Sequence, residues 1–95
     1  MNLEQQIADL TSELIRIPST HSRPDEIRRC ADFIEAWLAR RDIDYQRSDI
    51  AGVPALTVLP QPKATEILLM AHFDVVEAQD DSQFIPREVD GRLIN

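Results

Sequence analysis

Residues 67–76 of this chain read Ile67-Leu68-Leu69-Met70-Ala71-His72-Phe73-Asp74-Val75-Val76. An uninterrupted apolar run such as 67–71 is typical of a strand that other layers of the fold cover on both faces. We therefore predict a central strand of a sheet from Glu66 to Ala71. Residues two apart in an extended segment point the same way, so His72 and Asp74 are predicted to face one site just past this strand. Open α/β sheets place their functional groups at the carboxyl ends of their strands.

The pair of His72 and Asp74 allows two interpretations. A histidine beside a buried strand is more often a hydrogen-bonded structural residue than a ligand. The pair also suits metal chemistry, because a zinc-bound histidine usually donates its second ring proton to a carboxylate, which fixes the tautomer. The spacing alone leaves both interpretations open.

The rest of the chain is predicted to form two helices followed by strands. Apolar positions three and four apart indicate a core-facing helix from Leu3 to Arg16, which Pro18 ends. Pro24 begins a second, amphipathic helix that ends at Arg40-Arg41. Strands are predicted at 43–48 and 55–59, followed by a polar connection at 60–63, the central strand and a final hairpin around the Asp90-Gly91 turn. This order predicts an α/β fold in which both helices pack on the sheet.

Composition excludes several classes of partner. The formal net charge of −7 argues against nucleic acid and anionic membranes, because phosphate binding relies on clustered cations. The longest apolar run is too short to span a bilayer, and residues 1–4 lack the features of a secretory signal. We therefore expect a cytoplasmic protein. The single cysteine, Cys30, cannot form an internal disulfide, which suits a reducing compartment.

Other ligand-type side chains are not expected to bind metal. His21 lies in the predicted loop 18–23, where a histidine is usually solvated or capping. Cys30 falls in the apolar stripe of the second helix and is predicted to be a small buried residue. The acidic run 77–82 is predicted to be a solvated loop.

Several segments carry a family resemblance: Leu-Ile-Arg-Ile-Pro-Ser at 14–19, His-Phe-Asp-Val-Val-Glu-Ala at 72–78, Gln-Phe-Ile-Pro at 83–86 and Asp-Gly-Arg-Leu-Ile at 90–94. Together they resemble the N-terminal part of the M20 family of zinc metallopeptidases and amidohydrolases. That family includes dipeptidases, acetylornithine deacetylase, succinyl-diaminopimelate desuccinylase and carboxypeptidase G2. Glu77 stands where many members have proline, and Asp42 where they usually have glycine, so the subfamily stays open.

The resemblance implies a three-layer α/β/α zinc-peptidase-like catalytic domain, of which residues 1–95 form the incomplete N-terminal portion. It implies that His72 ligates one of two divalent metal ions and that Asp74 is the catalytic-site residue that orients it. The implied metal is zinc, although one histidine is also compatible with cobalt or manganese. The implied reaction is hydrolysis of an amide or peptide bond in a small peptide or an N-acyl amino acid.

Two hypotheses about the chain as a whole follow. In the family, the bridging carboxylate, the general base and the other ligands come later in the sequence, so we expect them beyond Asn95. The chain would then be a fragment of the hydrolase, inactive by itself and prone to self-association through exposed strand edges. The alternative is a complete, small acidic interaction module that keeps a degenerate peptidase fold without catalysis, and that we expect to be a monomer.

Overall fold

The computed structural model describes residues 2–59 and 66–94, so the polar connection predicted at 60–63 lies outside the described residues. Two helices are followed by four strands, which confirms a mixed α/β fold. In chain order these elements are α1 (Leu3–Ile15), α2 (Pro24–Arg40), β1 (Gln46–Ile50), β2 (Val53–Thr57), the 3-10 helix η1 (Asp81–Phe84), β3 (Arg87–Val89) and β4 (Arg92–Ile94). The strands form two antiparallel hairpins, β1–β2 and β3–β4.

Local sequence signals account for both helices. The side chain of Asn2 caps α1 by accepting a hydrogen bond of 2.8 Å from the backbone N–H of Gln5. Pro24 occupies the first turn of α2, where its missing N–H costs no helical hydrogen bond. Asp25 and Glu26 lie beside it at the positive end of the helix dipole. The predicted bounds of both helices are confirmed to within a residue.

Two-residue turns with positive φ angles close both hairpins. Asp90 and Gly91 have φ angles of 52° and 76°, and Ala51 and Gly52 have 52° and 81°. Positive φ at both central positions is the type I′ geometry, which matches the twist of paired strands. The final hairpin is therefore confirmed. The first hairpin forms at 46–50 and 53–57 instead of 43–48 and 55–59, because the turn at 51–52 sets its register.

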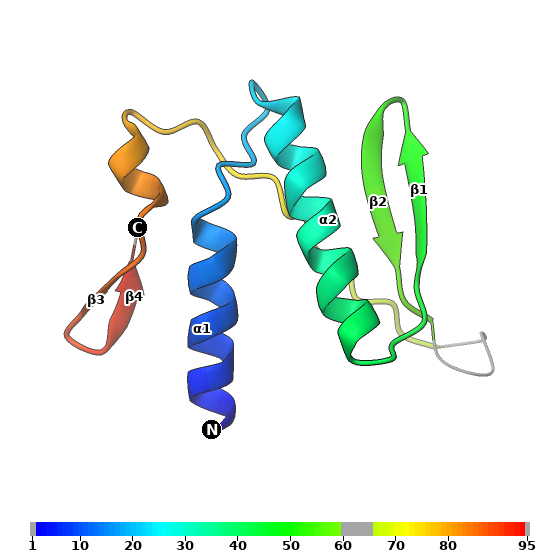
Figure 1. Cartoon of the computed structure of the whole chain (residues 1–95), viewed down its shortest axis with the longest axis horizontal. Coiled ribbons are helices and arrows are strands. Elements are labelled where there is room, and N and C mark those ends of the chain that lie inside the picture. The colour runs from blue at the N-terminus through cyan, green and yellow to red at the C-terminus, as the bar shows by residue number, and fades with distance from the viewer. Residues whose placement is uncertain (1, 60–65, 95) are drawn as a thin grey trace.

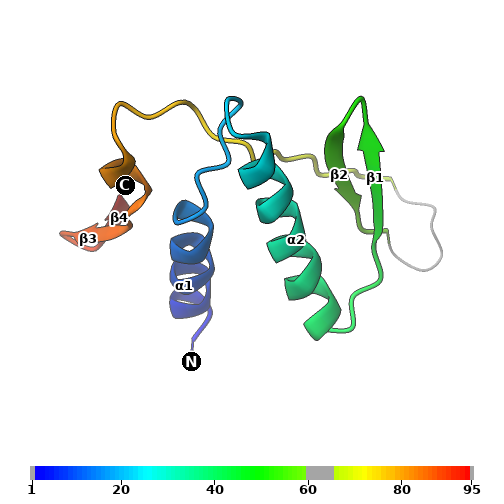
Figure 2. The same ribbon diagram turned by 45° about the horizontal axis from the view of Figure 1, so that its top comes forward.

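The small core is formed by α2 and by the chain just after α1, where Ile17 is buried. Helix α2 buries Cys30, Ala31 and Leu38, and it lies between α1 and the β1–β2 hairpin in Figures 1 and 2. A polar network supports this contact, because Arg47 of β1 pairs with both Asp32 and Glu35 of α2 at 2.6 Å. The α2 helix and the first hairpin therefore form one packed unit.

The expectation that α1 faces a core is wrong for the described residues. None of the residues of α1 is buried, and the side chains of Leu3 and Ile7 remain 71% and 57% exposed. The radius of gyration is 15.0 Å, compared with about 12 Å for a compact domain of this length. The reason is that neither hairpin packs closely on α1, which stands apart from both of them in Figure 1.

The predicted central strand at 66–71 is also wrong. Neither sheet of the described chain includes this segment, and Leu69 and Met70 are 90% and 86% exposed. A strand exists only when a neighbouring strand completes its ladder of hydrogen bonds. The apolar sequence indicates a tendency to be buried, but it cannot supply the neighbouring strand that burial in a sheet requires.

Candidate functional site

His72 and Asp74 lie on the same side of an extended segment, as their spacing predicts. The Nδ1 atom of His72 is 2.9 Å from the backbone oxygen of Asp74 and 3.0 Å from its Oδ1 atom. Both neighbours are acceptors, so the geometry favours the tautomer with the proton on Nδ1. In that tautomer the lone pair is on Nε2, which is the atom that a metal would bind. The two side chains are 83% and 58% exposed.

The exit of α1 holds this segment in place. The hydroxyl of Ser19 donates a hydrogen bond of 2.7 Å to the backbone oxygen of Phe73. The backbone N–H of Val75 donates one of 3.0 Å to the carbonyl oxygen of Ser19. Thr20 and Val75 form an isolated parallel bridge beside these bonds. Two of the segments that carry the family resemblance, 14–19 and 72–78, are therefore in direct contact.

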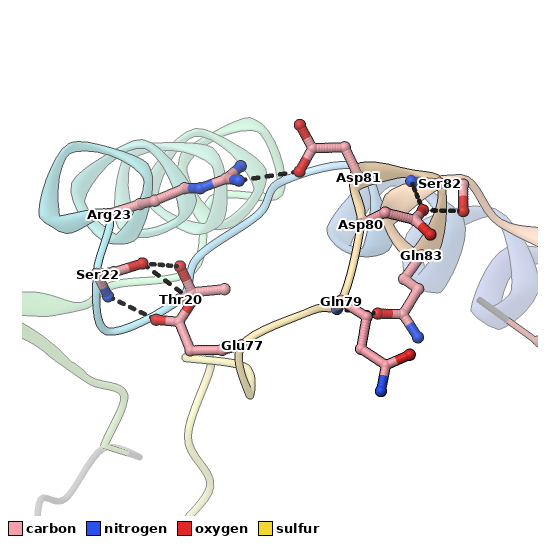
Figure 3. A network of polar contacts seen from close by, with 9 residues as sticks. All are labelled: Thr20, Ser22, Arg23, Glu77, Gln79, Asp80, Asp81, Ser82 and Gln83. Carbon is pink, nitrogen blue, oxygen red and sulfur yellow. Dashed lines mark hydrogen bonds and ion pairs between the residues drawn. The ribbon is translucent and has the colours of Figure 1, made fainter.

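The side chain of Glu77 fastens the end of the segment to the loop before α2. Its carboxylate accepts hydrogen bonds of 2.9 Å from both the backbone N–H and the hydroxyl of Ser22 (Figure 3). These bonds from Ser22, the hydroxyl first, hold the pKa of Glu77 below its usual value. We call this contact the Glu77 latch. The spacing of 55 residues between the partners explains why sequence patterns did not reveal it.

The rest of the acidic run is exposed, but it is not merely solvated as expected. Asp80 caps η1 by accepting a bond of 2.8 Å from the backbone N–H of Ser82, and it also contacts the Ser82 hydroxyl. Asp81 pairs with Arg23 at 2.9 Å (Figure 3). The pattern of Asp80 two residues before Ser82 is the signal for a local turn that could have predicted this cap.

The pH dependence of the Glu77 latch follows from the lowered pKa. A carboxyl group whose pKa is depressed by folding adds stability above its ordinary pKa, and this contribution is lost as the pH falls through the lowered value. We expect the Ser22 amide resonance to titrate with a midpoint below 4.5, the ordinary value for glutamate. NMR shifts recorded across an acid titration measure this midpoint. In Glu77→Gln the transition should vanish, whereas a midpoint at or above 4.5 in the unmodified chain would contradict the latch.

A half-open groove of about 680 Å³ lies beside the candidate pair. His72, Asp74 and Glu77 are among the residues that line it. Its surface is mainly apolar and includes residues from the end of α1 and from η1, such as Leu14 and Phe84. The pair therefore adjoins an apolar surface that is large enough to accept a small molecule or a further segment of protein.

The described residues supply one candidate metal ligand, His72, and not a complete metal site. Within 2–59 and 66–94, no three histidine, cysteine, aspartate or glutamate side chains gather in a way that could hold an ion. A catalytic zinc ion usually has three protein ligands, so an ion held by His72 would need partners from elsewhere. The fit to a metal ion therefore rests on one imidazole, that of His72, whose Nδ1 atom is held by Asp74 and whose Nε2 atom is left for the ion.

Cys30 lies behind the segment and is 1% exposed, which confirms the predicted buried residue. Burial raises the pKa of its thiol. Because the thiolate is the reactive form, we expect Cys30 to react with a thiol reagent at neutral pH at least about tenfold more slowly than in the urea-unfolded chain. With a reagent that releases a chromophore when it reacts with a thiol, absorbance measures both rates. Equal rates in buffer and urea would contradict the burial of Cys30.

Comparisons with known proteins give no family assignment. No protein-family model matches the chain, and no curated protein matches its sequence. Neither helix in the described part of the chain is long and apolar enough to cross a membrane.

Proposed function

We propose that this chain contributes a metal ligand to a metal-dependent hydrolase that cleaves an amide or peptide bond. The observation that carries the proposal is the pairing of His72 Nδ1 with Asp74, which leaves Nε2 for the metal. The proposed substrate is a small peptide or an N-acyl amino acid, as the resemblance to the M20 family implies. A cytosolic location is part of the proposal and suits a single unpaired cysteine.

The chemistry divides between the metal and the residues of this chain. A divalent ion, when bound, polarises the scissile carbonyl and lowers the pKa of its water toward about 7. His72 would hold one ion, for which zinc is proposed and cobalt or manganese is compatible. Asp74 would keep the imidazole in the correct tautomer and orientation. The general base and the other ligands would come from residues outside these 95, which form the N-terminal portion of the proposed catalytic domain.

The exposed apolar segment supports the same proposal. Residues 67–70 have the composition of a buried strand, yet each of their side chains is at least 65% exposed. Apolar surface of this kind is covered in stable proteins. In the proposed hydrolase, strands of the remaining catalytic domain would pair with this segment and cover it.

A second candidate function is a small acidic interaction module without catalysis. The exposed apolar residues 68–70 favour it, together with the net charge of −7. Such a module would use the exposed segment 67–70 to bind a partner by strand addition. Its binding to that partner would not depend on metal.

The test is hydrolysis by the protein isolated from its own source. Dipeptides and N-acyl amino acids are incubated with the protein before and after treatment with a chelator, and released amines are measured. We expect hydrolysis that the chelator removes and that zinc, cobalt or manganese restores. The 95-residue chain alone is expected to be inactive. No hydrolysis by the source protein with any of these substrates and metals would refute the proposal and favour the interaction module.

A further inference from the structure

Ser19 contacts the main chain on both sides of Asp74. We propose that Ser19 is a positioning residue that sets the orientation of Asp74 toward His72. That this positioning contributes to catalysis rests on the proposed function. The positioning itself concerns only residues of this chain.

The geometry follows from the planarity of the peptide group. The carbonyl of Phe73 belongs to the peptide group that precedes the Cα atom of Asp74, and it accepts the Ser19 hydroxyl at 2.7 Å. The N–H of Val75 belongs to the peptide group that follows this Cα atom, and it donates to the Ser19 carbonyl at 3.0 Å. One residue therefore fixes both peptide planes that define the backbone conformation of Asp74.

The second of these peptide groups also contains the carbonyl of Asp74. In a trans peptide the C=O and the N–H point in opposite directions, so the Val75 N–H turned toward Ser19 directs the Asp74 oxygen away from it. That oxygen lies 2.9 Å from His72 Nδ1. The contact with Ser19 is thus coupled to the hydrogen bond that selects the histidine tautomer.

The position of Ser19 is itself well defined. Ser19 is 1% exposed. Its backbone N–H donates a hydrogen bond of 2.8 Å to the Ile17 carbonyl, and the N–H of Thr20 donates one of 2.8 Å to the Pro18 carbonyl. Behind it, the Cys30 thiol lies 4.0 Å from the Phe73 oxygen, too far to replace the hydroxyl as a strong donor. Loss of the Ser19 hydroxyl would leave the Phe73 carbonyl with a weak partner only.

The first measurement needs no substitution and no metal. Amide hydrogen exchange is recorded in the unmodified 95-residue chain, and the Val75 N–H is compared with the rate for an unstructured peptide of the same sequence. We expect Val75 to exchange at least about tenfold more slowly, because its N–H is held by Ser19. Exchange at the unstructured rate would overturn the proposal, whether or not any variant folds.

The second measurement compares Ser19→Ala with Ser19→Thr, which keeps the hydroxyl, and with Ser48→Ala as a matched serine substitution on the exposed face of β1. Nitrogen-15 shifts of His72 at a fixed alkaline pH report the ratio of Nδ1–H to Nε2–H tautomers. We expect Ser19→Ala to lower this ratio by about three- to tenfold, the effect of one lost hydrogen bond. We expect Ser19→Thr to restore it and Ser48→Ala to leave it unchanged. An unchanged ratio in Ser19→Ala would overturn the proposal.

These results are independent of the test of function. A chain that shows protected Val75 and a Ser19-dependent tautomer, but belongs to a protein without hydrolysis, would retain the positioning contact and lose the proposed enzyme. A metal-dependent hydrolase in which Ser19→Ala leaves the His72 tautomer ratio unchanged would retain the function and lose this inference.

Discussion

Replacing His72 with alanine is expected to lower hydrolysis by the proposed enzyme by more than about 100-fold, because changes to residues that only orient a ligand already cost about 10–100-fold. Asp74→Asn is expected to fall within that smaller range, since the amide keeps the shape of the carboxylate but accepts a weaker hydrogen bond. The measurement is kcat/KM of the zinc-loaded enzyme isolated from cells that carry each variant.

His21→Ala is the matched control for this prediction. His21 is exposed in the loop between α1 and α2 and takes no part in the candidate pair, so its replacement should leave kcat/KM unchanged. Equal losses in His21→Ala and His72→Ala would point to a general effect on folding. Full activity in His72→Ala would contradict the role of His72 as a ligand.

Self-association of the 95-residue chain is expected to decrease strongly when Leu69 and Met70 are both replaced by lysine. These residues are 90% and 86% exposed in an apolar segment, which is the kind of sequence that pairs with other chains. Two adjacent positive charges oppose such pairing. Sedimentation velocity over a range of concentrations should show oligomers for the unmodified chain and a monomer for the double variant.

Ile50→Lys is the control for charge and surface hydrophobicity. Ile50 is 68% exposed at the end of β1, so this variant removes exposed apolar surface without touching residues 67–70. We expect it to self-associate like the unmodified chain. A monomeric unmodified chain with a cooperative thermal transition would instead favour the interaction module.

Local signals predicted the elements that depend on neighbouring residues in the chain. The start of α2 at Pro24 and the turn at Asp90-Gly91 each depend on contacts within a few residues, and the structure confirms them. The His72–Asp74 contact belongs to the same class, since the partners are two residues apart. Periodicity and turn chemistry suffice for such features.

Features that depend on distant residues were not predictable from pattern alone. The apolar run at 67–71 indicates a buried strand, but strand pairing depends on other segments, and neither sheet of the described chain includes this run. The Ser19–Phe73 bond and the Glu77 latch join residues 54 and 55 positions apart. No periodic signal in one sequence connects such positions, so the support of the candidate site became visible only in three dimensions.

Native mass spectrometry of the protein isolated from its own source tests the central claim most directly, because one spectrum reports both chain length and bound metal. The account predicts a species several times heavier than the 10.9 kDa of these 95 residues, with divalent metal ions that a chelator removes. A species of 10.9 kDa that carries no metal would contradict it.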